Sequence, residues 1–230
     1  MARTLTPEET QQEYVAAMGA ELGSVFFRLY NEFAWLHLRW HQFRVLFGTK
    51  PERVRLLNAA AGLLFRLVQD SRWEDTLLHI SRITDKVDTG GRPNLTIRLL
   101  PGLVTDSTLA AALQESVSDA VTKTEFARDW RNRRIAHADL ALAMKEGAKP
   151  LAQASRQDVE GALAAVGNVL NQLESYYKHG TVYFKPFGDP GDAESLLYVI
   201  RDGLEAETAR RERVQTGRAL ESDLGPPRAV

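Results

Sequence analysis

The chain has 230 residues, of which 44% are hydrophobic and 26% charged, a composition that fits a globular protein with a buried core. The formal net charge of −1 argues against nonspecific coating of nucleic acid, and the absence of cysteine excludes disulfides, thiolate catalysis and zinc ribbons. No signal-peptide stretch and no apolar run of roughly 20 residues is present, so we expect a cytoplasmic protein with no membrane partner.

The first half of the chain contains repeated signals for the start of a helix. Thr6-Pro7-Glu8-Glu9 is a capping box with proline at the first helical position. Thr49-Lys50-Pro51-Glu52 repeats this signal after Gly48, and Ser71-Arg72-Trp73-Glu74 is a further capping box. The helices expected from these signals cover residues 7–21, 24–47, 51–69 and 71–83.

The second half continues this pattern after its clearest loop, residues 88–94. The helices expected here cover residues 95–100, 106–121, a segment from about 122 that carries a basic motif, 155–178 and 192–214, with a loop at 146–154 and one extended segment at 181–184. We therefore predict an all-α fold with long antiparallel helices. Its parts are a helical bundle domain over 1–180, a linker and C-terminal helix over 181–214, and a disordered tail over 215–230.

The long helix over 24–47 carries large side chains at steps of three, four or seven residues. They are Phe26, Tyr30, Phe33, His37, Trp40 and Phe47. This spacing indicates a stripe buried in a helical bundle. The alternative is that part of the stripe packs against a second subunit.

The basic motif contains the residues most suited to chemistry. Arg131 and Asn132 are followed, after four residues, by His137. They combine a permanent cation, an amide and the side chain type that ordinarily titrates near neutral pH. Nearby arginines, Arg128, Arg133 and Arg134, would add affinity for phosphate. The structural alternative makes these arginines ion-pair partners on a surface helix and the histidine an ordinary last-turn residue.

The spacing within the motif bears on how many chains form one site. On a continuous α-helix, Arg131 and His137 are separated by about 9 Å along the axis and about 120° around it. The two side chains therefore do not easily reach one phosphate from a single chain. A twofold axis would let Arg131 of one subunit face His137 of the other, which predicts a homodimer.

The motif and its surroundings resemble the HEPN superfamily (higher eukaryote and prokaryote nucleotide-binding), whose signature is Arg, a polar residue, four to six residues and His. The segments 47–54, 73–85 and 130–139 resemble its abortive-infection U-type branch. The likeness covers about residues 10–178 and not the last helix or the tail. It implies a HEPN-type helical bundle.

The resemblance also implies a metal-independent, dimeric endoribonuclease of toxin or phage-defence type that needs no cofactor. Its partners would be RNA, a second copy of the chain, and an antitoxin or regulatory protein. His137 would act as general base or acid, Arg131 would stabilise charge on the phosphate, and Asn132 would orient the substrate or the histidine. The expected product is a 2′,3′-cyclic phosphate. In one branch of the superfamily the position of Asp139 holds a tyrosine that is modified, so that control is not expected here.

Four polar residues are candidates for supporting the motif: Ser81, Arg82, Asp85 and Asp139. For the first three, the structural alternative is a buried network between Arg82 and Asp85. Two other functions stay open. One is a noncatalytic HEPN scaffold for RNA or protein. The other is a metal-dependent hydrolase using His37 and His41, which lie one helical turn apart.

Overall fold

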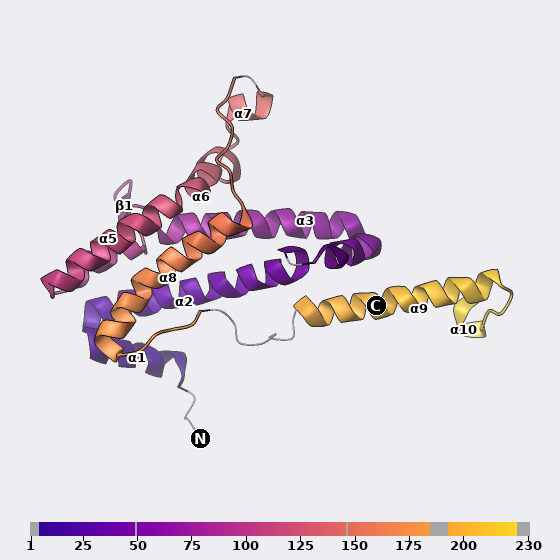
Figure 1. Ribbon diagram of the computed structural model, residues 1–230, viewed down its shortest axis with the longest axis horizontal. Coiled ribbons are helices and arrows are strands. Elements are labelled where there is room, and N and C mark those ends of the chain that lie inside the picture. Colours follow the sequence, from indigo (N-terminus) through magenta and orange to yellow (C-terminus); the bar gives the residue numbers. More distant parts are fainter. Residues whose placement is uncertain (1–4, 49, 146, 185–192, 225–230) are drawn as a thin grey trace. The chain divides into compact units, whose positions relative to one another are not determined.

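The computed structural model describes residues 5–48, 50–145, 147–184 and 193–224 (Figure 1). These residues are almost entirely helical, which confirms the predicted all-α class. The α-helices are α1 (Pro7–Met18), α2 (Ala20–Phe43), α3 (Pro51–Ile83), α4 (Leu100–Leu103), α5 (Ser107–Lys123), α6 (Glu125–Trp130), α7 (Leu140–Met144), α8 (Arg156–Lys178), α9 (Ala193–Gln215) and α10 (Glu221–Leu224). Two π-helical turns, η1 (Arg44–Gly48) and η3 (Arg131–Ile135), and one 3-10 turn, η2 (Ile97–Leu99), complete the helical elements, and β1 (Asp88–Thr89) pairs antiparallel with β2 (Arg92–Pro93).

The chain divides into two compact units. The first comprises residues 1–41 and 71–186, and the second comprises 42–70 and 187–230. In the second unit, Arg53 of α3 forms an ion pair of 2.6 Å with Glu194 of α9. The structure thus groups α9, the observed form of the C-terminal helix expected over 192–214, with residues 42–70. All residues of the candidate site lie in the first unit.

The core of the first unit is built from the apolar faces of α2, α3, α5 and α8. Its fully buried side chains include Phe26, Phe33, Leu77, Ile80, Leu113, Leu170 and Leu173. Helix α5 packs along α8. Phe26, Phe33 and Trp40 of the predicted stripe are buried, and Tyr30 contacts Phe184 with ring centroids 5.4 Å apart. These side chains therefore belong to the core of this chain.

Several helix starts follow the predicted capping chemistry. Thr6 and Ser155 form capping boxes, and Asp106 caps α5 by accepting a hydrogen bond from the Leu109 amide. The first helix, however, ends at Gly19, whose φ of +85° an L side chain rarely adopts. Gly23 lies within α2 instead, against the backbone of α1.

Other elements differ from the prediction. Helix α3 continues through the expected break near Ser71 and has its non-helical residue at Ala61, just before Gly62. In the predicted loop, Gly90 and Gly91 adopt positive φ values and form the turn of the β1–β2 hairpin.

Two further segments differ as well. Pro101 lies in the first turn of α4 rather than ending a helix. Residues 221–224 of the expected disordered tail form α10, where Asp223 is bound by Arg213. No helix within the described residues has the length and apolar character to cross a membrane.

Candidate functional site

The motif lies where α6 changes into the π-helical turn η3. The Ala136 amide donates to the Arg131 carbonyl at 2.8 Å, a bond that spans five residues rather than the four of an α-helix. The helix ends at Ile135, and His137 lies exposed in the bend that follows. The continuous α-helix assumed for the spacing of Arg131 and His137 is therefore not the observed geometry. Single π turns occur frequently at functional sites.

The Arg131 side chain is held by two acceptors. Its Nη1 donates to Asp85 Oδ2, and its Nε donates to Asn132 Oδ1 at 3.0 Å. The Arg131 and Asp85 side chains are only 22% and 18% exposed, so water screens this ion pair less than a surface pair. The pair joins residues 46 positions apart and uses two of the five N–H groups of a guanidinium. The folded chain thus presents a partly buried, oriented Arg131.

Two further arginines converge on the C-terminal end of α3. Arg98 Nε and Arg128 Nη2 each donate to the Thr84 carbonyl at 2.9 Å, and Arg128 also bonds to Thr84 Oγ1 at 3.1 Å. Such cations satisfy the free carbonyl groups at a helix end and favour the negative end of its dipole. Burial, together with the neighbouring Arg98 charge, lowers the pKa of Arg128.

We call Arg98, Arg128 and Arg131 the arginine cluster. The only carboxylate that bonds to a member of the cluster in the described structure is Asp85, so three guanidinium groups carry an excess of positive charge. A phosphate group is the type of anion that such a cluster binds. Arg98 was not found from the sequence, because it lies 33 residues before the motif and no local pattern links it to Arg131.

Arg133 has a structural role in the described structure. Its Nη2 donates to the Lys149 carbonyl at 2.6 Å and its Nη1 to the Pro150 carbonyl at 3.3 Å. The same guanidinium pairs with Asp129 and Asp139 at 3.6 and 3.3 Å. Arg133 therefore fastens the loop before α8 to the motif, and its predicted binding of RNA stays a prediction.

Arg134 is the most exposed of the three arginines predicted to bind RNA. Its Nε lies 3.3 Å from Glu74, and its guanidinium lies 5.5 Å from the centre of the Trp130 ring. This arrangement matches the surface ion pairing expected in the structural alternative. It leaves the side chain about half exposed, so an RNA phosphate can still reach it.

The four predicted support residues have different places. Asp85 contacts Arg131, whereas Arg82 pairs with Glu32 at 3.2 Å, so the expected Arg82–Asp85 network does not form. Asp139 caps α7 through the Leu142 amide, and that bond together with Arg133 lowers the pKa of its carboxyl group. Ser81 is fully buried, and its hydroxyl has no hydrogen-bond partner among the described residues.

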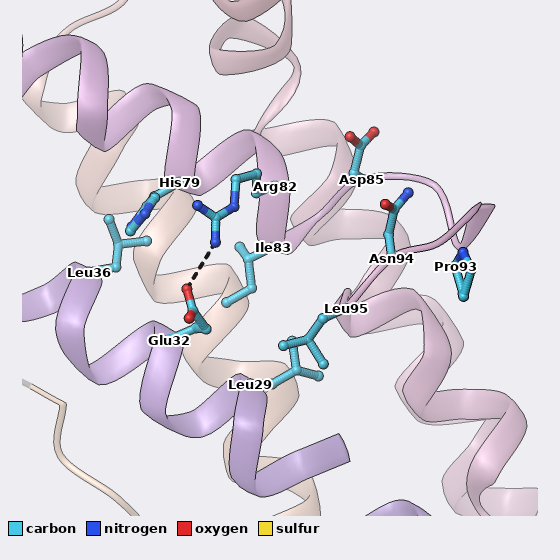
Figure 2. A pocket seen from close by; sticks show the side chains of 10 residues that line it. All are labelled: Leu29, Glu32, Leu36, His79, Arg82, Ile83, Asp85, Pro93, Asn94 and Leu95. Carbon is cyan, nitrogen blue, oxygen red and sulfur yellow. Dashed lines mark hydrogen bonds and ion pairs between the residues drawn. The ribbon is translucent and has the colours of Figure 1, made fainter. Parts of the chain in front are cut away.

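A cavity of about 240 Å³ lies beside the Arg131–Asp85 pair. Figure 2 shows its polar side chains, including Glu32, His79 and Arg82, together with the apolar side chains of Leu29 and Leu95. Asp85 lines the cavity and also binds Arg131, so it belongs both to the cavity and to the ion pair with the motif. The sequence did not predict this cavity, because its walls come from α2, α3 and the segment after β2.

The pair His37 and His41 does not form part of an evident metal site. The His37 ring packs edge-on against Phe33 and stacks on Phe184, with centroid distances of 4.6 and 5.8 Å. Within the described ranges, no group of three or more His, Cys, Asp or Glu side chains is placed to hold a metal ion. His37 therefore acts as an aromatic packing residue in this fold.

An all-helical bundle with an Arg-Asn-x4-His segment next to clustered arginines defines a HEPN-type domain. The family model HEPN_AbiU2, described as AbiU2, matches residues 20–196. The chain therefore belongs to the AbiU2 family of HEPN proteins. A search of curated proteins and a search of solved structures each found no match. The matched range contains the motif, the arginine cluster and the cavity.

Proposed function

We propose that this protein is a metal-independent endoribonuclease of toxin or phage-defence type, with a cleavage site shared between two subunits. The observation that supports this proposal most is the arginine cluster at the end of α3, whose members Arg128 and Arg131 closely precede the exposed His137 in sequence. Such a cluster fits the phosphodiester of RNA, and an accessible imidazole fits the proton transfers that its cleavage requires.

The residues divide the reaction as follows. The ribose 2′-hydroxyl attacks the adjacent phosphorus while a general base removes its proton, and the bond from phosphorus to the 5′-oxygen breaks. The leaving oxygen takes up a proton, which yields a 2′,3′-cyclic phosphate and a 5′-hydroxyl. His137 serves as the base or the acid in this sequence. Arg131 stabilises the charge on the phosphate oxygens. Asn132 accepts a hydrogen bond from Arg131 Nε and thereby orients the guanidinium.

The shared site is argued from the different settings of Arg131 and His137. Asp85 draws Arg131 toward the end of α3, whereas His137 lies beyond the π turn in an exposed bend. A second subunit related by a twofold axis would supply the missing group at each site. We therefore expect a homodimer with both copies of His137 near the axis.

The proposal is tested with RNA cleavage by the purified full chain in excess chelator. His137→Ala should abolish cleavage while RNA binding stays nearly unchanged, because the imidazole moves protons and adds little affinity. Arg131→Ala should weaken both, with a loss of about 3 kcal/mol in transition-state stabilisation. Arg211→Ala is the matched control, since Arg211 is an exposed residue of α9 paired with Glu207. Equal cleavage by the wild type and His137→Ala would refute the enzymatic function.

A noncatalytic RNA-binding scaffold is the second candidate. It is favoured by the ion pairs that Arg131, Arg133 and Arg134 make within the chain, with Asp85, Asp129 and Glu74 among their partners. Such pairs stabilise the domain whether or not it cleaves RNA. Salt-dependent RNA binding without cleavage products, in wild type and His137→Ala alike, would support the scaffold.

A further inference from the structure

The cavity beside Asp85 is lined by both polar and apolar side chains. The polar ones include Glu32, Arg82 and Asn94, and the apolar ones include Leu29 and Leu95 (Figure 2). Its volume of about 240 Å³ is slightly below the roughly 300–1,000 Å³ of typical ligand pockets. This size suits one planar ring system rather than a larger ligand.

We propose that this cavity binds the guanine base of an RNA nucleotide whose phosphate contacts the arginine cluster, an inference that rests on the proposed function. We call the cavity the base pocket. This proposal goes beyond cleavage itself, because the base pocket would give the enzyme a preference for guanine in the nucleotide beside the scissile bond.

The position of the base pocket links it to the phosphate site. Asp85 lines the pocket, and its carboxylate also binds the Arg131 guanidinium. Arg131 keeps N–H groups beyond the two bonded to Asp85 and Asn132, and these can donate to a phosphate. Unstacked RNA bases are commonly read in this way, with the base in a pocket and the phosphate on arginine.

The Glu32–Arg82 pair in the pocket matches the Watson–Crick edge of guanine. Glu32 Oε2 accepts from Arg82 Nη2 at 3.2 Å, and both side chains are about half exposed, so a ligand can reach them. Guanine offers two adjacent donors, N1–H and N2–H, to the two oxygens of a carboxylate, and its O6 accepts from an arginine. Adenine, cytosine and uracil present no such pair of adjacent donors to a carboxylate.

The apolar side chains of the pocket support the faces of the ring. Leu29, Leu36 and Ile83 are buried core residues of α2 and α3 that also line the pocket. Leu95, which follows the β1–β2 hairpin, is 41% exposed and lies beside Leu29 (Figure 2). A base inserted against these side chains would bury its apolar faces, whereas a free phosphate or sugar would gain little there.

The test measures binding of the four 3′-mononucleotides to the full chain by titration calorimetry. These ligands cannot be cleaved, so the result does not depend on catalysis. The wild type should bind 3′-GMP about 5-fold to 150-fold more tightly than 3′-AMP, 3′-CMP or 3′-UMP. Inosine 3′-monophosphate, which lacks the 2-amino group, should fall between 3′-GMP and 3′-AMP.

Two variants assign the preference to the pocket. Glu32→Gln should remove the preference for 3′-GMP but keep the weak affinity common to all four ligands, which comes from the phosphate. Leu95→Trp should fill the pocket and weaken binding of 3′-GMP most. Glu52→Gln is the matched control, because Glu52 pairs with Arg55 on the exposed surface of α3. Thermal melting followed by circular dichroism confirms that each variant is folded.

The outcomes separate this proposal from the proposed function. Equal affinities for the four nucleotides, a preference for another base, or a 3′-GMP preference that persists in Glu32→Gln would overturn the base pocket. If the wild type cleaves RNA but gives any of these results, the proposed ribonuclease function is retained and the base pocket is rejected. A Glu32-dependent preference for 3′-GMP in a protein that cleaves no RNA supports the pocket and refutes the ribonuclease.

Discussion

Asp85 is the residue that connects the separate parts of the candidate site. It lies just after α3, binds Arg131 of the motif and lines the base pocket. Its carboxylate orients Arg131, but it also offsets part of the positive charge that would attract RNA. The two effects act in opposite directions on cleavage and on binding, so they can be measured separately.

We predict that Asp85→Asn binds single-stranded RNA more tightly at low salt but cleaves it more slowly. The loss of one negative charge beside three arginines should steepen the slope of log affinity against log salt by about 0.7. Cleavage should slow because Arg131 loses the ion pair that orients it. Salt-dependent binding and single-turnover cleavage check the two effects.

Asp119→Asn is the control for this variant, since Asp119 pairs with Lys123 on the surface of α5. A decrease in both affinity and salt dependence for Asp85→Asn would show that Asp85 serves the fold and not the charge balance of the site.

Among the elements, the best predicted are those fixed by local chemistry. The side chains of Thr6, Asp106 and Ser155 cap their own helices, so four residues of sequence suffice to indicate each start. The capping box at Ser71 does not start a new helix, because α3 continues through it in regular helical conformation. The π turn η3 was not predicted either, since its residues have no distinctive pattern.

The crossing of α1 and α2 gives a prediction about stability. A Cβ atom added at Gly23 would lie 2.5 Å from the Tyr14 carbonyl oxygen, so Gly23→Ala requires the two helices to move apart. We expect it to lower the free energy of unfolding by about 1–3 kcal/mol. Gly161→Ala in α8 meets no atom within 4 Å and should instead stabilise by about 0.4–1 kcal/mol. Urea denaturation measures both, and equal effects would contradict the close crossing.

The contact between α1 and α8 predicts a dependence of stability on alkaline pH. Burial and the nearby Glu174 carboxylate raise the pKa of Tyr14 above its ordinary value. Above about pH 10 the unfolded chain releases this proton whereas the native chain retains it, so the free energy of unfolding falls as pH rises.

Tyr14→Phe should lessen that fall. Near neutral pH the Tyr14 hydroxyl is protonated in both states, so the variant should change the pH dependence of the free energy of unfolding there much less than at alkaline pH. Tyr198→Phe, at a position on α9 that is 52% exposed, is the control. Urea denaturation at several pH values measures the effect, and an unchanged alkaline slope in Tyr14→Phe would be the contrary result.

For the whole molecule, the sequence could supply only the parts of the site that lie close together in the chain. Arg131, Asn132 and His137 follow from their spacing, and Asp85 from a polar end to an apolar helix. Arg98 joins them only because the chain folds back along α3 after the hairpin. The base pocket likewise needs α2 beside α3, which no local pattern specifies.

Mixing two inactive variants tests the shared site. If Arg131 of one subunit serves His137 of the other, a heterodimer of Arg131→Ala and His137→Ala has one intact site and one that lacks both groups. With random mixing about half of the dimers are heterodimers, so activity should recover to about a quarter of wild type. Native mass spectrometry establishes that heterodimers are present. A mixture as inactive as its parents would place each site within one chain.

The loop before α8 offers a way to follow the motif without measuring activity. Ala152 is held from both sides, since its amide donates to Asp129 Oδ2 at 2.8 Å and its carbonyl accepts from Trp130 Nε1 at 2.9 Å. An amide bonded in this way should exchange its hydrogen with solvent slowly, although it belongs to no helix. Because its partners immediately precede Arg131, the Ala152 resonance should report spectroscopically on events at the motif.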